Sequence, residues 1–329
     1  MHGQGNLRIA VLALVLLVLP GALCIAEGAQ ENVVLRAASP FKPGHILVDA
    51  AEKFKSIIEE ETKGRITVLL IAGAATEEDV NTQCSRGVVD IQLTGGRPVE
   101  VFAPQYFFFN APYVIKDYPH FLRVWNGPLG KKAKDQVLAN GNMMDMGTVS
   151  RGLRQTTSNK PITGPGDLIG LKLRLPVVET WIAVWKSLGV EAVPVPLTEL
   201  YAALKSGKAE ASEGDLPQLV SFKLAEVQSQ LSITNHLVAI GWVMINTESH
   251  GRLSSSDQKR VMSAMKKACD WATEKTNANE GELVKQLQSA GMKVTTPDAA
   301  AIREKAKPAI ESLFKTAWPV TTWAEVLAQ

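Results

Sequence analysis

Two arginines are the residues of this sequence whose types and positions most clearly indicate chemistry. Arg174 lies in the apolar run LKLRLP, which has the composition of a buried strand, and Arg154 lies in the polar, loop-like segment that begins RGLRQTTSNKPI. A guanidinium in a buried strand costs free energy unless a carboxylate or phosphate accepts its paired N–H groups. The partner of Arg174 is either an anionic ligand or an Asp or Glu of the protein, and these residues alone leave both interpretations open.

Common catalytic and metal-binding signatures are absent from the sequence. It contains no G-x-S-x-G, H-E-x-x-H or G-x-x-x-x-G-K-[ST] motif, and no G-x-G-x-x-G segment follows a predicted strand. The histidines stand apart from one another, which argues against a metal site, and His236 is expected to be structural. We therefore expect neither a cofactor nor catalysis, with a secreted hydrolase that uses His45 or Asp215 as the alternative.

The first residues predict export. Arg8 precedes an apolar stretch over residues 9–25 that Pro20 interrupts, so residues 1–26 have the profile of a cleaved signal peptide. No later apolar run reaches the roughly 20 residues of a membrane-spanning helix. The 35 basic and 33 acidic residues leave a net charge of +2, which gives no indication of nucleic-acid binding. This composition fits a periplasmic protein that binds a small molecule.

The elements that must position the arginines alternate between strand and helix. Ligands of such α/β sheets bind beyond the carboxyl ends of the strands, so the loop at residues 95–98 is a candidate site wall. There Gly95 would let a ligand approach the backbone and Arg97 would supply charge, unless the loop is an ordinary glycine turn. The patterns in this first part predict strands over 33–38, 66–71 and 88–93 and helices over 46–62 and 77–87.

A second unit repeats the alternation from about residue 151. About 300 residues remain after a signal peptide, which exceeds the usual size of a single core and predicts two lobes. Cys84 and Cys269 both lie in predicted helices and are expected to be buried free thiols, although one bridge is the alternative. The patterns predict strands over 171–176, 190–194, 209–213 and 238–246, and helices over 180–188, 199–205 with Thr198 as its cap, 223–231 and 255–291.

Four motifs relate the chain to a known family. RQTTSNKPI, GLKLRLP, LTELYAALKSG and EVQSQLSITNH occur in this order. They resemble the substrate-binding proteins of tripartite ATP-independent periplasmic (TRAP) transporters, of the dicarboxylate- and sialic-acid-binding type. The resemblance implies a two-lobed α/β fold, with a mixed sheet flanked by helices in each lobe and a helical hinge. It places residues 30–152 with about 240–279 in lobe I, and 153–239 with about 280–329 in lobe II.

The resemblance also assigns roles and shows departures. In the family the strand arginine grips the ligand carboxylate, which implies this role for Arg174, and Arg154 often contributes to the same pocket. Where relatives commonly have V-D-G-Q-E-N-P, this chain has Gly214 in place of the amide and Asp215 in place of the proline. Gly95 stands where sialic-acid binders carry a carboxylate. Sialic-acid contacts are therefore not expected.

The nature of the ligand beyond its carboxylate rests on two side chains. If Asp215 faces the cleft, it would accept hydrogen bonds from hydroxyl groups, which favours a uronate or another sugar acid. Trp181 either stacks on the ligand, which would suit an aromatic acid, or packs in the core. A dicarboxylate is the third alternative and would need a further cation such as Arg97. The candidate ligand-binding residues are thus Arg174, Arg154, Asp215, Gly214, Trp181, Arg97, Gly95 and His45.

The resemblance implies partners as well. Closure of the lobes around the organic acid would present a composite surface to the membrane permease subunits of the transporter, and an ion gradient would supply the energy. A monomer is expected. The alternative is a periplasmic sensor component that docks on a receptor, which would have the same pocket but no permease.

Overall fold

The strands come from segments distributed along the whole chain. The computed structural model describes residues 31–73 and 75–329, so the predicted signal peptide at 1–26 lies outside the described residues. The strands are β1 Val33–Ser39, β2 Ile66–Ala72, β3 Ile91–Thr94, β4 Met143–Ser158, β5 Lys172–Leu175, β6 Glu191–Pro194, β7 Ala211–Asp215, β8 Gln230–Asn246 and β9 Lys293–Thr295.

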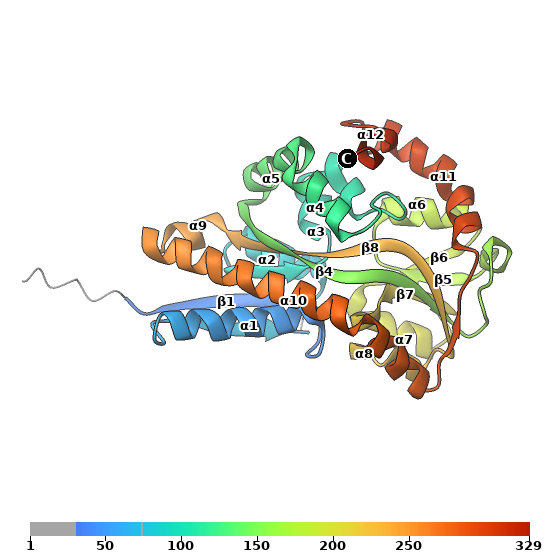
Figure 1. Cartoon of the computed structure of the whole chain (residues 1–329), viewed down its shortest axis with the longest axis horizontal. Helices are drawn as coiled ribbons and strands as arrows, with labels where there is room; N and C mark the ends of the chain where they lie inside the picture. The colour runs from blue at the N-terminus through green and yellow to red at the C-terminus, as the bar shows by residue number, and fades with distance from the viewer. Residues whose placement is uncertain (1–30, 74) are drawn as a thin grey trace, which may run out of the picture. The chain divides into compact units, whose positions relative to one another are not determined.

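The helices occur between these strands along the chain, and they also form the C-terminal part (Figure 1). The α-helices are α1 Ile46–Glu61, α2 Glu77–Ser85, α3 Arg97–Phe102, α4 Tyr118–Asn126, α5 Pro128–Gly141, α6 Glu179–Ser187, α7 Leu200–Lys205, α8 Leu216–Ser221, α9 Thr247–Gly251, α10 Ser255–Ser289, α11 Ala299–Thr316 and α12 Trp323–Leu327. Short 3₁₀ segments are η1 Pro104–Asn110, η2 Pro165–Leu168, η3 Leu197–Glu199 and η4 Leu224–Glu226.

The two long strands β4 and β8 connect the two lobes of the fold. The strands pair in the order β2-β1-β3-β8-β4-β7-β5-β6, and β9 pairs with β8. β4 has 16 residues and β8 has 17, so each is long enough to pair with neighbours in both halves of the sheet. Parallel and antiparallel pairs coexist, which makes the sheet mixed as predicted. The exact lobe boundaries along the chain stay predictions.

Irregular pairing interrupts β4 where the two halves of the sheet meet. Its first half pairs with the end of β8, and from Arg154 onward it also pairs with β7. The register against β8 shifts between Ser150 and Leu153, and again between Arg154 and Thr156. Such bulges bend a strand and change the direction of its side chains. Arg151 and Arg154 lie in this irregular stretch.

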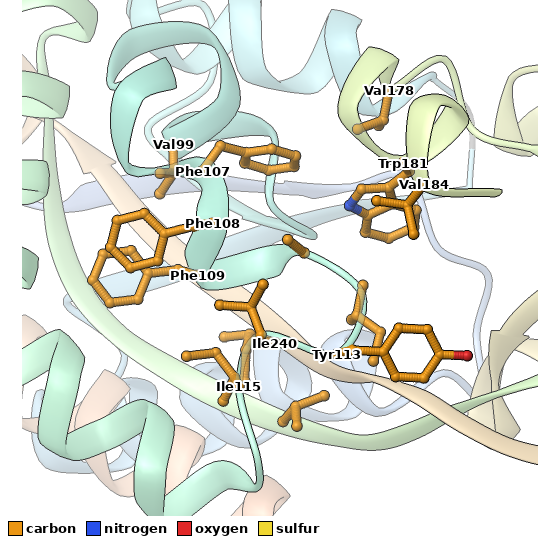
Figure 2. Packing of buried hydrophobic residues seen from close by; sticks show 14 of the residues in the cluster. Val99, Phe107, Phe108, Phe109, Tyr113, Ile115, Val178, Trp181, Val184 and Ile240 are labelled. Carbon is orange, nitrogen blue, oxygen red and sulfur yellow. The ribbon is translucent and has the colours of Figure 1, made fainter. Parts of the chain in front are cut away.

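Alternation along β8 separates two hydrophobic cores, one on each face of the sheet. Trp242 and Met244 belong to one cluster, and Val243 and Ile245 belong to the other. The first cluster contains the aromatic side chains of η1, drawn in Figure 2. Each cluster draws residues from both halves of the sheet, so neither core is confined to one lobe.

The C-terminal helices pack across this framework. α10 has 35 residues (Figure 1) and contacts α1, β4 and α8. Cys84 and Cys269 are buried and free, as expected. Within residues 31–73 and 75–329, none of the helices has both the length and the hydrophobicity needed to cross a bilayer.

Three local predictions were wrong. The segment from Arg151 to Ser158 is part of β4 rather than a loop, and most of residues 223–231 lies in η4 and the start of β8 rather than in a helix. Thr198 lies inside η3, and α7 begins after Glu199 without a side-chain cap, so Thr198 does not cap it. In each case a contact with a distant segment or a 3₁₀ turn overrides the local pattern.

Candidate functional site

A cavity of about 130 Å³ lies beyond the carboxyl ends of β1, β3, β5 and β6. This is the edge at which α/β sheets bind their ligands. The loops that follow these strands supply most of its walls, and β4 supplies two arginines. Its lining includes five of the predicted site residues, together with one that the sequence did not suggest: Arg174, Arg154, Trp181, Arg97 and Gly95, and Arg151.

Arg174 is a buried cation with no ionic partner among the residues that the structure describes. Its residue is 1% exposed, and its Nε and Nη2 donate to the carbonyl oxygen of Val195 at 2.9 and 2.6 Å. No carboxylate of residues 31–73 or 75–329 lies within ion-pairing distance of it. Burial lowers the pKa of Arg174 to about 10, because removing the guanidinium from water disfavours its charged form. Of the two interpretations of Arg174, an internal salt bridge is therefore excluded among the described residues.

Arg154 differs from Arg174, because a buried carboxylate of the protein neutralises its charge. Its Nη2 donates to Oε1 of Glu213 at 2.7 Å, and its Nε donates to Oε2 of the same carboxylate. Glu213 is fully buried, and its Oε2 also lies 3.1 Å from Nε2 of His236. Burial alone would raise the pKa of Glu213, but the charge of Arg154 lowers it to about 2. Arg154 thus lines the cavity as one end of a buried ion pair.

Arg151 is a third guanidinium at the cavity, and the sequence reasoning missed it. Its Nη2 donates to Oδ2 of Asp215, and its guanidinium lies 4.4 Å from the ring centre of Phe41. In a regular strand, residues three apart point to opposite faces. The register shift between Ser150 and Leu153 brings Arg151 and Arg154 to the same cavity. Local sequence carries no signal for Arg151 like that of Arg174, because its segment is polar and loop-like and becomes a strand only by pairing with β7 and β8.

Asp215 does not face the cavity, contrary to expectation. It is fully buried, it pairs with Arg151, and its Oδ1 caps α8 by accepting the backbone N–H of Gln218 at 3.0 Å. Burial alone would raise the pKa of Asp215, but the charge of Arg151 holds it far below its usual range. A carboxylate that is engaged in this way supports Arg151 and is not available to ligand hydroxyls.

His45 also lies behind the cavity wall. Its Nδ1 accepts the backbone N–H of Leu47 at the start of α1, its ring stacks on Phe41, and its Nε2 is 3.5 Å from Asp215. Burial lowers the pKa of His45, which keeps the ring neutral. Gly214 belongs to the same supporting layer, because it is a buried residue of β7 and is not part of the lining.

Trp181 packs in the hydrophobic core and also lines the cavity. Its Nε1 donates to the carbonyl oxygen of Asn110 at 2.6 Å, and it is part of the hydrophobic cluster in Figure 2. The guanidinium of Arg154 lies 5.1 Å from its ring centre, within the range of a cation–π contact. Arg154 therefore occupies one face of the indole, which leaves less of the ring for an aromatic ligand.

Acidic side chains line the cavity from α2 and α3. Glu77 accepts the backbone N–H of Gly95 at 2.8 Å, and Glu78 follows it on the same helix. A Cβ at Gly95 would lie 2.8 Å from Oε1 of Glu77 and 3.2 Å from Nη1 of Arg151, so glycine is needed for this approach. Carboxylates in this position are acceptors for ligand hydroxyl groups.

Arg97 is engaged with a neighbour on its own helix. Its Nη1 donates to Oε2 of Glu100 at 2.8 Å. Burial raises the pKa of Glu100 to about 7, although the charge of Arg97 opposes this shift. Arg97 is therefore not the free second cation that a dicarboxylate would require.

Acidification should destabilise the protein through this buried network. The pKa of Glu213 is about 2 in the fold against 4.5 ordinarily, so its stabilisation is complete above about pH 4.5 and is lost as the pH falls toward 2. Burial also lowers the pKa of His45 and His236, so protonation of the unfolded chain begins the loss below about pH 6.5. Glu100, whose pKa is raised to about 7, acts in the opposite direction between about pH 7 and 4.5. Urea unfolding between about pH 4.5 and 3 should therefore show the decline due to Glu213, and a flat profile over that range would contradict it.

A larger hollow elsewhere carries none of these features. About 980 Å³ of space lies between α11, α12 and the segment from Tyr113 to Lys116. Its basic residues alternate with Glu304 and Glu311, and none of the predicted site residues lines it. The smaller cavity is the better candidate, because it holds buried charge that a ligand can neutralise. Within residues 31–73 and 75–329, no group of three or more His, Cys, Asp and Glu side chains is arranged to hold a metal ion.

Comparison with known proteins decides the family. Residues 37–317 match the family model described as bacterial extracellular solute-binding protein, family 7. This chain belongs to that family. The match covers both long central strands and every residue that lines the cavity. The family is one of extracellular solute-binding proteins, and the resemblance to TRAP solute-binding proteins noted from the four motifs is confirmed.

Two relatives and one solved structure show how far the similarity extends. The sialic-acid-binding periplasmic protein SiaP of Vibrio cholerae is 29% identical over 288 residues, which cover 87% of this chain and 90% of that protein. A solute-binding protein of Roseobacter denitrificans is 30% identical over 316 residues, which cover 90% of this chain and 97% of that protein. The crystal structure of a TRAP periplasmic solute-binding protein from the same organism, with bound L-galactonate, has a TM-score of 0.83 at 26% identity and covers 91% of this chain and 100% of that one. The predicted two-lobed α/β fold is thereby confirmed.

Proposed function

We propose that this protein captures a small hydroxylated monocarboxylate, of the aldonate or uronate type, in the periplasm and delivers it to the permease subunits of a TRAP transporter. One observation carries the proposal: Arg174 is buried at the cavity with no carboxylate of the described residues beside it. An isolated buried charge is costly, and a ligand carboxylate would neutralise it with two hydrogen bonds. The other two buried arginines, Arg151 and Arg154, already have partners.

The charges of the cavity favour one carboxylate over two. Arg174 is the single buried guanidinium of the lining without a carboxylate partner in the described chain, so the cavity offers one unpaired buried cation to a ligand carboxylate. Glu77 and Glu78 would repel a second carboxylate but accept hydrogen bonds from hydroxyl groups. These two residues take the role that the sequence assigned to Asp215. The charge balance supports a sugar acid over a dicarboxylate.

The size of the cavity and the relatives support the same class. About 130 Å³ is well below the roughly 300–1,000 Å³ of pockets for drug-sized ligands, which favours a compact acid. The Roseobacter denitrificans structure contains L-galactonate, a hydroxylated monocarboxylate of this kind. The Vibrio cholerae relative is named for sialic acid, a bulkier ligand, and Gly95 offers no side chain to hold such a ligand here.

The proposed mechanism is hinge closure without catalysis. The lobes meet where the β4 ladder is irregular, and Arg151 and Arg154 extend from that stretch into the cavity. A carboxylate held by Arg174 would favour the closed arrangement, and exclusion of water would strengthen the ion pair. The permease subunits would then recognise the surface formed by both closed lobes. His45 and Asp215 have structural partners, which removes the support for a hydrolase that uses them.

Calorimetric titration of the purified protein tests this function. The panel should contain L-galactonate, D-galacturonate, succinate, indole-3-acetate, sialic acid and the neutral galactonolactone. We expect an aldonate or uronate to bind most tightly, and at a hundred times its Kd to stabilise the fold by about 2.7 kcal/mol. Binding of the lactone as tightly as the free acid would contradict carboxylate capture. Preference for succinate would contradict the monocarboxylate assignment.

A further inference from the structure

We infer that the side-chain amide of Gln218 is a specificity-determining group that hydrogen-bonds one hydroxyl of the bound sugar acid. This inference rests on the proposed function and goes further, because it identifies a group that distinguishes hydroxylated acids from their deoxy analogues. Gln218 is the third residue of α8 and lines the cavity. No motif or local pattern in the sequence singles it out.

The amide of Gln218 has no partner in the described part of the chain. The residue is 2% exposed, its Nε2 is buried without a hydrogen-bond partner, and no hydrogen bond reaches its Oε1. Its backbone N–H, in contrast, is fixed by Oδ1 of Asp215 at 3.0 Å. A buried amide that lacks a partner is costly, and most such groups in proteins are satisfied. The position of Gln218 at the cavity wall makes the ligand the missing partner.

Gly214 leaves the space that this amide occupies. A Cβ at position 214 would lie 2.7 Å from Nε2 and 3.1 Å from Cδ of Gln218. Any side chain at 214 would therefore force the amide to move. Gly214 was noted as replacing an amide that relatives carry at this position, and Gln218 provides an amide to the same region from the first turn of α8.

Asp215 completes the arrangement by fixing the start of α8. Its carboxylate accepts from Gln218 through the backbone and from Arg151 through the side chain. Both cavity-lining residues are thus held by one buried anion that does not itself reach the lining. Arg151 and Gln218 would present N–H groups to the ligand from fixed positions. The substitution of Asp for Pro at position 215 therefore acts on the cavity through these two neighbours.

A site built to hydrogen-bond a hydroxyl group discriminates strongly against a ligand that lacks it, because its own polar group is then left unpaired. Titrations with L-galactonate and each of its monodeoxy analogues test this for Gln218. In the wild-type protein, removal of one hydroxyl should weaken binding by roughly tenfold or more. In Gln218→Ala, L-galactonate should bind correspondingly more weakly, and removal of that same hydroxyl should cost nothing further.

Two further variants make the result specific. Gly214→Ala keeps the glutamine but displaces its amide, so it should reproduce the loss seen in Gln218→Ala. Gln228→Ala is the matched control, because Gln228 is also 2% exposed and does not line the cavity. It should leave the affinity for L-galactonate and its analogues unchanged.

The outcomes separate this inference from the proposed function. If every deoxy analogue loses the same factor in wild type and in Gln218→Ala, Gln218 does not contact a hydroxyl and the inference fails, while carboxylate capture by Arg174 stands. Equal affinity of wild type and Gln218→Ala for L-galactonate would overturn it as well. If L-galactonate and its lactone bind the wild type equally well, the proposed function fails first, and the inference fails with it.

Discussion

Replacing Arg174 with methionine should weaken binding of L-galactonate by roughly a hundredfold or more, because a buried, hydrogen-bonded charge pair is worth about 2–5 kcal/mol. The same substitution should change the free energy of unfolding of the ligand-free protein by no more than about 1 kcal/mol. Arg174 has no carboxylate to leave behind in the described chain, so its loss creates no unpaired buried anion. Calorimetry and urea unfolding measure the two effects separately.

The small effect on stability follows from two opposing changes. Burial lowers the pKa of Arg174 to about 10, which means that its charged form is destabilised in the ligand-free protein and that methionine relieves this cost. Methionine also removes the donors to the Val195 carbonyl oxygen, which costs about 1–3 kcal/mol if that oxygen stays dry. The exposed Lys172 lies on the same strand, and Lys172→Met is the control that should change neither quantity.

A different result would identify a different role for Arg174. Strong destabilisation of the ligand-free variant would indicate that the arginine mainly supports the β5–β6 region through Val195. Retention of acid binding in a folded variant would contradict carboxylate capture directly. The prediction thus separates a residue that the fold tolerates for function from one that the fold requires.

The elements at the start of the chain could be predicted because their local patterns are strong. The helix expected over residues 46–62 is α1, Ile46–Glu61, and the strands before and after it differ from expectation by a residue at their ends. An amphipathic stripe and short β-branched runs specify these elements without distant partners. Arg174 could be recognised in the same way, since a charge in an apolar strand is visible in the sequence.

The strand β4, which connects the two halves of the sheet, could not be predicted from local sequence. β4 contains Gly147 and Gly152 and many polar residues after Arg151, which is typical of a loop, and it is held in a strand by β7 and β8 from later parts of the chain. Its bulges place Arg151 in the cavity, and sequence spacing alone would put Arg151 and Arg154 on opposite faces. Pairing with distant strands, rather than propensity, determines this half of the site.

The placement of Asp215 shows a second limit. All five residues of β7 are buried, so no alternation of exposed and buried positions indicates which side chains face the cavity. The sequence identified Asp215 and Gly214 as unusual, but it did not show that one supports Arg151 and the other leaves space for Gln218. The carboxylates that do line the cavity, and that we propose as acceptors for ligand hydroxyl groups, are Glu77 and Glu78, on a helix far earlier in the chain.

Replacing Arg154 with methionine should strongly destabilise the ligand-free protein, in contrast to the Arg174 substitution. Glu213 would remain fully buried after losing the guanidinium that contacts both of its carboxylate oxygens. Breaking a buried ion pair on one side typically costs about 3–5 kcal/mol, because the remaining charge has no partner. The free energy of unfolding of Arg154→Met, measured in urea without ligand, should fall by about that amount.

The partner substitution identifies the cause of this loss. In the double variant Arg154→Met with Glu213→Gln, no unpaired carboxylate is left behind, and the neutral amide can still hydrogen-bond with His236. At least half of the lost stability should therefore return. If the double variant is as unstable as Arg154→Met alone, the loss comes from packing of the arginine on Trp181 or from its contact with Asp215, rather than from the stranded charge of Glu213. Loss of less than about 1 kcal/mol in Arg154→Met would show that water or His236 compensates Glu213, and that Arg154, like Arg174, is held in place for the ligand.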